Sequence, residues 1–276
     1  MKKILLILFS LSFLSLTSIS NAKSIRIGTE GAYPPWNNLN SAGELEGAEI
    51  DFGNEACARM AVDCEWVTQD WDGIIPALLQ GKYDIIIAGM SITEERKEKV
   101  NFTNGYMTDG ARFAVMKGSG LEGLTVGKGV NKVNLNNAGG KEQAAIGQLI
   151  AAMNGSTVCV QSSTIHQNFL EKHMSGAVKV RLYQSVDDHN LDLRAGRCDA
   201  VLADVGSIID FMESGGGVNV AFTGPTFSGG VFGDGVGGAI RKEDKDILEM
   251  WNEVIAEMSA DGTTAEITKK WFGRDI

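Results

Sequence analysis

Short β-rich runs alternate with helical patterns along this chain, and the alternation comes in two separate series. In the first series, the patterns predict strands at 24–29, 65–68 and 83–88 and helices at 50–61 and 71–79. Strands that alternate with helices in this way are typical of an α/β fold with a largely parallel sheet.

The second series predicts strands at 157–161, 178–183 and 199–203, with helices at 163–174 and 186–195. Two series of this kind predict two sheets and therefore two lobes. The chain has 276 residues, of which 43% are hydrophobic, so it is long and apolar enough to bury two modest cores.

Near the end of the chain, apolar residues recur at the spacing of a helix that packs by one face. This face consists of Ile247, Trp251, Val254, Ile255 and Met258. We interpret these side chains as part of the core and not as contacts for a cofactor.

The first 22 residues have the three parts of a secretory signal peptide. Lys2 and Lys3 are the positive region, 4–16 is an apolar run broken only by serines, and 20–22 is a cleavage site of the small-x-small type. The apolar run is shorter than the roughly 20 residues that span a bilayer, so an uncleaved anchor is the weaker interpretation. The mature chain is expected in the periplasm.

The charge and the motifs exclude several classes of function. The net charge of -10 argues against nucleic acid or an anionic lipid surface as a partner, because both repel acidic proteins. The sequence has no phosphate-binding loop, no serine-hydrolase elbow and no zincin motif. The glycine cluster at 229–238 does not lie between a strand and a helix, so we interpret it as a turn and a hinge between the lobes.

The cysteines and histidines do not predict a metal site. His166, His173 and His189 lack ligand spacing and are expected at the surface. Disulfides persist in an oxidising compartment, and a local disulfide between Cys57 and Cys64 is favoured over two free buried thiols. Two further cysteines, at 159 and 198, are either a second bridge or buried thiols.

Polar and aromatic residues gather on the loops that follow the predicted strands, where open α/β sheets bind their ligands. These loops supply an arginine, hydroxyl groups, two aromatic side chains and two carboxylates. They span 29–36, 69–76, 88–96, 161–164 and 203–204.

Four motifs resemble the periplasmic substrate-binding proteins of polar amino-acid ABC importers, which are solute-binding proteins of family 3. They are Asp-Trp-Asp-Gly-Ile-Ile-Pro-Ala-Leu from Asp70, Gly-Met-Ser-Ile-Thr-x-x-Arg up to Arg96 and then Val-Asn-Phe-Thr, Ala-Gly-Arg-x-Asp-Ala at 195–200, and Asp-Gly-Thr-x-x-x-Ile-x-x-Lys-x-Phe from Asp261. The resemblance covers nearly the whole mature chain.

This resemblance implies a two-lobed periplasmic-binding-protein fold of type II, in which each lobe is a mostly parallel sheet flanked by helices and a two-strand hinge joins the lobes. Residues 23–110 and 228–276 would form lobe 1, and residues 111–227 would form lobe 2. It also implies a monomer without a cofactor and without enzymatic activity, which delivers an amino acid to an ABC permease in the inner membrane.

The resemblance assigns one end of the site to the ligand α-carboxylate. Arg96 would clamp it, since a guanidinium and a carboxylate match as a bidentate, charge-assisted pair. Ser91 and Thr164 would add hydroxyl or backbone N–H donors, and Thr164 opens a predicted helix whose N-terminus favours an anion. Gly89 and Met90 lie in the same loop as Ser91 and are also expected at the ligand.

The rest of the ligand would meet two carboxylates and two aromatic rings. Asp204 would bind the α-ammonium group, Tyr33 and Trp71 would sandwich the side chain, and Glu30 would receive a distal positive charge. From the residues alone, these four could equally be caps, surface charges or core aromatics. We expect Thr93 to be an N-cap.

The ligand class stays open between two patterns. Glu30 and the Cys57/Cys64 spacing resemble the lysine/arginine/ornithine, histidine and opine binders, whereas Ala88-Gly89 is closer to the glutamine binders. The sequence therefore predicts capture of a polar amino acid, favours a cationic one, and leaves glutamine or broad polar specificity as an alternative. A second alternative is a cyclohexadienyl dehydratase-like enzyme in which Glu30 or Asp204 would do the acid–base work, and a third is a sensor module.

The segment 117–157 is richer in glycine and asparagine than its surroundings. It contains an amphipathic patch formed by Ile146, Leu149, Ile150 and Met153. We expect an elaborated surface loop that carries a short helix.

Overall fold

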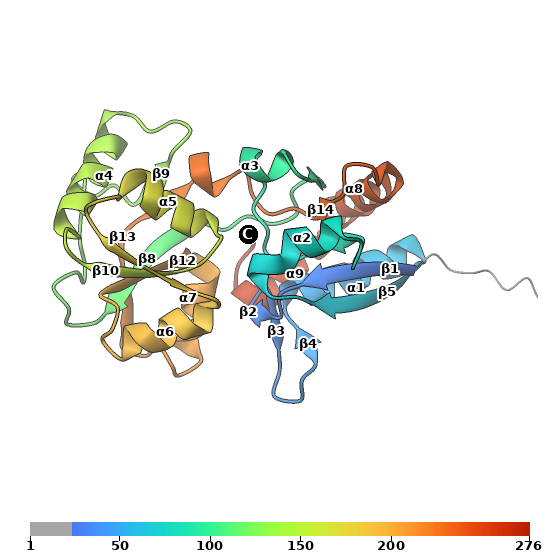
Figure 1. Ribbon diagram of the computed structural model, residues 1–276, viewed down its shortest axis with the longest axis horizontal. Coiled ribbons are helices and arrows are strands. Elements are labelled where there is room, and N and C mark those ends of the chain that lie inside the picture. Colours follow the sequence, from blue (N-terminus) through green and yellow to red (C-terminus); the bar gives the residue numbers. More distant parts are fainter. Residues whose placement is uncertain (1–23) are drawn as a thin grey trace, which may run out of the picture.

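The computed structural model describes residues 24–276, which form two α/β lobes side by side (Figure 1). The predicted signal peptide, 1–22, lies outside the described residues. None of the helices in 24–276 is both long and apolar enough to cross a membrane.

Lobe 1 is built on a five-stranded sheet with the order β5-β1-β6-β14-β7. Strands β1, β5 and β6 are parallel, and β14 runs antiparallel to both of its neighbours. The bounds are β1 Ser24–Thr29, β5 Asp63–Thr68, β6 Ile85–Ile86, β7 Asn101–Phe102 and β14 Ala239–Ile240. A small sheet beside it consists of β2 Ala32–Tyr33, β3 Asn37–Leu39 and β4 Leu45–Glu46.

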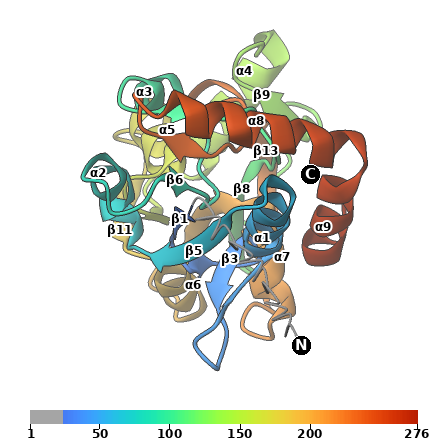
Figure 2. The same cartoon turned by 90° about the vertical axis from the view of Figure 1, so that its right-hand side faces the viewer.

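The helices of lobe 1 pack around this sheet. Helices α8 and α9 both lie against α1 (Figure 2). The bounds are α1 Ala48–Met60, η1 Trp71–Gly73, α2 Ile74–Leu79, α3 Glu94–Lys97, α8 Lys245–Ala260 and α9 Thr263–Phe272. The five apolar residues predicted to form one face of the C-terminal helix are all buried in α8, which confirms that prediction.

Lobe 2 is built on a six-stranded sheet with the order β11-β10-β12-β8-β13-β9. Its bounds are β8 Ala111–Met116, β9 Lys132–Asn134, β10 Thr157–Gln161, β11 Lys179–Tyr183, β12 Ala200–Asp204 and β13 Val220–Ser228. The helices are α4 Gly140–Ala152, α5 Ile165–His173, α6 Val186–Arg194 and α7 Val205–Glu213, and a short η2 helix spans Gly230–Phe232.

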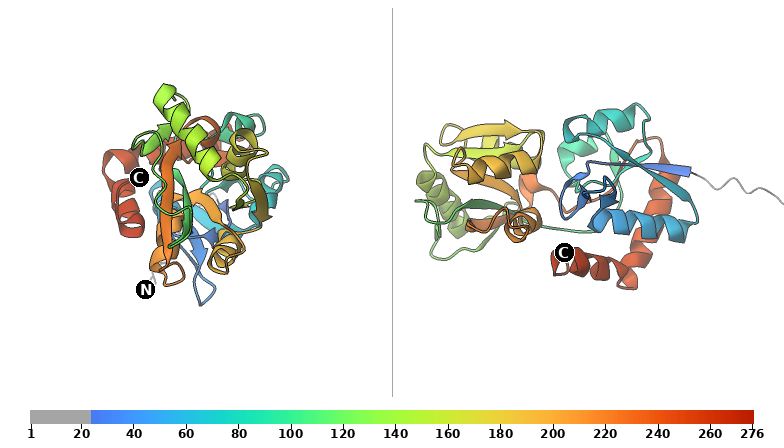
Figure 3. Two further views of the ribbon diagram at one scale, coloured as in Figure 1. Left: turned by 90° about the vertical axis from the view of Figure 1, so that its left-hand side faces the viewer. Right: turned by 90° about the horizontal axis from the view of Figure 1, so that it is seen from below.

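Two segments cross between the lobes, 103–110 from β7 to β8 and 229–238 from β13 to β14 (Figure 3). Met107 and Val236 form an antiparallel bridge between the two segments. The glycine cluster therefore lies in a crossing segment, as the sequence predicted. The finer division of the chain at 110/111 and 227/228 stays a prediction.

Two expectations about buried residues were wrong. His166 and His189 are buried rather than exposed, because His166 lies beside Asp204 and Phe232 and His189 lies on the inner face of α6. Segment 117–157 is more than a surface loop. Its strand β9 extends the sheet beside β13, and Leu149 and Met153 are buried in the lobe 2 core.

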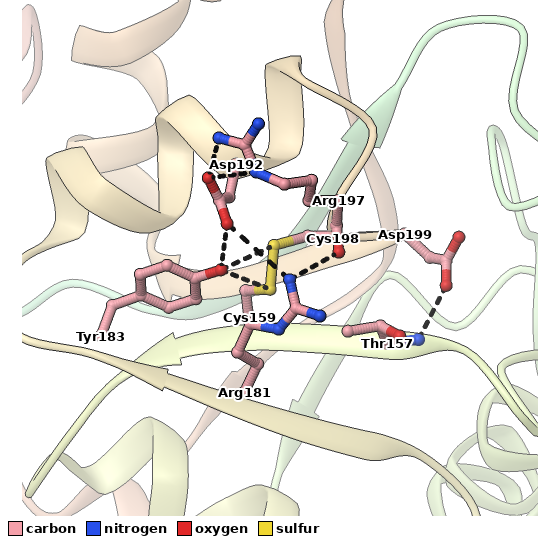
Figure 4. The surroundings of a disulfide bond; sticks show 8 residues. All are labelled: Thr157, Cys159, Arg181, Tyr183, Asp192, Arg197, Cys198 and Asp199. Atoms are coloured by element: carbon pink, nitrogen blue, oxygen red, sulfur yellow. Dashed lines mark hydrogen bonds and ion pairs between the residues drawn. A yellow bond between two sulfur atoms is a disulfide. The ribbon is translucent and has the colours of Figure 1, made fainter.

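Two disulfides lie in the described chain, Cys57–Cys64 in lobe 1 and Cys159–Cys198 in lobe 2. Figure 4 shows the second bridge among polar side chains, with Asp192 and Arg197 on one side of it and Tyr183 and Arg181 on the other. The Tyr183 hydroxyl lies 3.8 Å from each sulfur and donates a hydrogen bond to Asp192. The undecided cysteine pair is therefore a bridge that ties β10 to the residues just before β12.

Candidate functional site

A small cavity lies between the lobes, where loops that follow strands of both sheets meet. This is the location that open α/β sheets use for ligands. Lobe 1 contributes Glu30, Tyr33, Trp71, Ala88, Gly89, Ser91 and Arg96. Lobe 2 contributes Gln161, Thr164, Ile165, His166 and Asp204.

Arg96 is the cation of this cavity. Thr93 caps the short α3 helix by accepting a hydrogen bond from the Arg96 amide, as predicted. This hydrogen bond fixes the backbone from which the Arg96 side chain extends. The guanidinium donates through Nη1 to the Ser91 carbonyl over 3.0 Å and lies 5.2 Å above the Trp71 ring. Burial lowers the pKa of Arg96 to about 10, with Glu95 and Asp204 acting in the opposite direction, so it stays charged at neutral pH.

Each oxygen of the Asp204 carboxylate has a polar partner, one from each lobe. The Tyr33 hydroxyl donates to Oδ2 over 2.7 Å from lobe 1, and His166 Nε2 lies 3.1 Å from Oδ1 within lobe 2. Asp204 is the last residue of β12, and its side chain is buried. The carboxylate is therefore presented to the cavity in a defined orientation.

Glu30 follows β1 and is also buried. Gln161, at the end of β10, donates to Oε1 over 2.6 Å, and the same amide nitrogen donates to the Gln184 carbonyl. Burial raises the pKa of Glu30 to about 7, while the Gln161 hydrogen bond opposes the rise. This carboxylate lacks a cation partner in the cavity and is partly protonated at neutral pH.

The lobes are in contact around the cavity. Besides the Tyr33–Asp204 and Glu30–Gln161 hydrogen bonds, the Trp71 indole donates to the Ser163 carbonyl over 3.0 Å. Further interlobe hydrogen bonds join Ser162 to Asp72 and Asn168 to Glu95. The structure therefore holds the closed arrangement of the two lobes, with the polar side chains of each lobe facing those of the other.

Every residue predicted to contact a ligand lines the cavity except Met90. The Met90 side chain is fully buried in the core with Ile74 and Leu78. The Thr164 hydroxyl caps α5 by accepting from the Gln167 amide and donates to the Gln161 carbonyl. The Thr164 hydroxyl therefore already makes two hydrogen bonds within the protein.

Four lining residues were not predicted as ligand contacts: Ala88, Gln161, Ile165 and His166. Ala88 and Gln161 belong to loops that the sequence singled out. Ile165 and His166 follow Thr164 directly, so the first turn of the predicted helix was a signal that could have found them.

Across residues 24–276, the structure holds no group of three or more histidine, cysteine, aspartate or glutamate side chains that could bind a metal ion.

Comparison with known proteins identifies relatives along the full described chain. The model of the family "Bacterial extracellular solute-binding proteins, family 3" matches residues 25–274. An L-arginine-binding protein of Pseudomonas aeruginosa is 37% identical over 100% of this chain and 98% of its own length. An octopine-binding periplasmic protein of Rhizobium meliloti is 36% identical over 92% of each chain.

A solved structure has the same architecture. A periplasmic His/Glu/Gln/Arg/opine family-binding protein from Silicibacter pomeroyi, in complex with lysine, superimposes with a TM-score of 0.72. It is 34% identical to this chain, and the match covers 90% of this chain and 97% of that one.

Proposed function

The chain belongs to the bacterial extracellular solute-binding proteins of family 3, and from this premise we propose that it captures a cationic amino acid or opine in the periplasm and delivers it to an ABC importer. The observation that carries the proposal is the charge content of the cavity, which combines Arg96 with the carboxylates of Asp204 and Glu30. A ligand with one carboxylate and two positive groups is complementary to this set.

Each charged group has one role in this proposal. Arg96 binds the ligand α-carboxylate, with Ser91 and the N-terminus of α5 beside it. Asp204 binds the α-ammonium group. Glu30 receives the distal positive charge between the rings of Tyr33 and Trp71.

Capture proceeds by closure of the lobes, and no covalent step is involved. Each lobe carries part of the site, so the ligand binds one lobe first and the other lobe then closes over it. Closure expels water, and the charges then interact in a medium of lower dielectric constant. The interlobe hydrogen bonds described above support this mechanism.

A thermal-shift screen of the mature protein tests the ligand class. A ligand that binds only the folded state at 100 times its Kd adds about 2.7 kcal/mol, which corresponds to a shift of roughly 5 to 10 °C in a chain of this size. We expect such shifts with arginine, lysine, ornithine or octopine. Equal shifts with glutamine and other neutral amino acids would contradict the role of Glu30, and a response to prephenate alone would favour the dehydratase.

The pH dependence of binding tests Glu30 directly. A cationic ligand group needs the ionised carboxylate, and in the closed arrangement burial raises the pKa of Glu30 to about 7. Below that pH, a proton must leave before the ligand binds, so the Kd for L-arginine is expected to rise by up to about tenfold per pH unit between pH 7 and 5. Calorimetry in buffers of different ionisation enthalpy should record the released proton.

The matched control for this measurement is Glu30→Gln, which keeps the size of the side chain and removes its titration. It should bind L-arginine more weakly and show a flatter pH profile. If the parent protein has the same profile as this variant, another group controls the pH dependence and Glu30 does not bind the cation.

A further inference from the structure

Glu49, the second residue of α1, is fully buried and does not line the cavity. Its carboxylate accepts hydrogen bonds from three donors. The Tyr106 hydroxyl donates to Oε1 over 2.6 Å, the Gly89 amide donates to both oxygens over 2.8 Å, and the Asn37 side-chain amide donates to Oε2 over 2.9 Å. A carboxylate suits this position because it offers acceptors only.

Two of these donors lead to the loops that form the ligand cavity. Gly89 lines the cavity and has a φ of +59°, a conformation that glycine adopts without strain. Asn37 accepts a hydrogen bond from the Gly31 amide over 2.7 Å through its side-chain oxygen, and Gly31 directly follows Glu30. One buried carboxylate therefore holds two of the loops of lobe 1 on which the ligand contacts lie.

The third donor leads to the hinge. Tyr106 lies in the crossing segment 103–110, and its backbone amide donates to the Val236 carbonyl in the other crossing segment over 3.0 Å. Its ring stacks on Phe52 of α1, with ring centroids 4.5 Å apart. A rotation of the lobes that displaces Tyr106 would therefore act on Glu49, and through it on the loops at the ligand.

The burial of Glu49 is unfavourable on its own. It raises the pKa of this carboxyl group, and the hydrogen bonds from Tyr106, Gly89 and Asn37 act in the opposite direction. An apolar residue would fill the same space without this penalty, but it would leave three buried donors without an acceptor.

We propose that Glu49 is a positioning residue that couples the ligand-contact loops of lobe 1 to the hinge. The geometry of the cavity and the closure of the lobes then depend on the same carboxylate. This inference rests on the proposed function, because it assigns Glu49 to the capture of the same ligand.

The test uses two variants and two matched controls. Glu49→Gln removes the charge and one acceptor, and Tyr106→Phe removes only the bond from the hinge. Asp192→Asn and Tyr183→Phe change the same chemistry, a tyrosine hydroxyl on a carboxylate, in lobe 2 and away from the cavity. The readouts are the Kd for L-arginine and, without ligand, the hydrogen exchange of the amides in 86–91.

We expect the Kd to rise about tenfold for Glu49→Gln and about three- to tenfold for Tyr106→Phe, with both controls within about twofold of the parent. Tyr106→Phe should also speed the exchange of the Gly89 amide, which it does not contact. A general loss of stability would instead speed exchange throughout lobe 1.

An unchanged Kd for both variants, or an unchanged exchange rate at 86–91 in Tyr106→Phe, would overturn the coupling. If Glu49→Gln does not fold, Tyr106→Phe decides by itself. If the parent protein binds none of L-arginine, L-lysine, L-ornithine and octopine, the proposed function fails, while the exchange rates of the ligand-free variants still support or refute the coupling.

Discussion

Replacing Arg96 with methionine is expected to weaken the binding of L-arginine by about 3 to 5 kcal/mol, or roughly 100- to 5000-fold. The reason is that the ligand α-carboxylate would enter a closed cavity that has no other arginine or lysine on its wall. Methionine fills much of the volume of the arginine side chain. The loss of affinity therefore measures the missing charge and hydrogen-bond donors, and not an empty space left by the substitution. Isothermal calorimetry of the parent and the variant measures it.

The same substitution should not lower the stability of the ligand-free protein. The buried guanidinium donates only one side-chain hydrogen bond within residues 24–276, to the Ser91 carbonyl, and burial shifts its pKa downward. Its removal therefore relieves an unfavourable burial. If Arg96→Met loses affinity while its unfolding midpoint is unchanged or raised, Arg96 contributes to ligand binding and not to the stability of the fold.

Arg112→Met is the matched control. Arg112 also donates to one backbone carbonyl, that of Gly224, and lies 4.9 Å above an aromatic ring, that of Phe222, but it does not line the cavity. Its replacement should leave the Kd within about twofold of the parent value. Equal losses of affinity in Arg96→Met and Arg112→Met would show that the effect is not specific to the proposed carboxylate clamp.

The parts of the structure that follow from local patterns were predictable. The strand at 157–161 is found with the predicted bounds, and the helix at 186–195 differs from α6 by one residue. The strand at 83–88 shrinks to Ile85–Ile86, although the Ile87 amide still donates to the Gly28 carbonyl before the chain turns at Gly89. The periodicity of the apolar residues predicts that a helix or strand forms. The residue at which a strand ends depends on its pairing with the neighbouring strands.

The site was predictable where the loops after strands carry charged or aromatic residues, and less so where a role depends on packing. Met90 lies between two cavity residues, but the backbone directs its side chain into the core. Glu49 reads as an ordinary acidic residue in the first turn of a helix. Only the tertiary structure brings Gly89, Asn37 and Tyr106 to its carboxylate, because these donors are distant in sequence.

Replacing Cys159 and Cys198 together with alanine is expected to lower the free energy of unfolding by about 3 to 4 kcal/mol. The bridge spans a sequence separation of 39 residues, and without it the unfolded chain gains the entropy of that open loop. Urea unfolding of the ligand-free protein measures the loss, with the m-value as a check that the transition stays comparable.

The lobe 1 bridge is an internal control, because Cys57 and Cys64 are separated by only 7 residues. The loop-length dependence alone makes the removal of the long bridge more costly by about 1.5 kcal/mol. Equal losses in the two double variants, or a larger loss for the short bridge, would mean that native contacts and not loop closure set the contribution of these disulfides. In that case the contacts of Tyr183 with the two sulfurs of the lobe 2 bridge would be the next to vary, since Tyr183→Phe removes them without opening the loop.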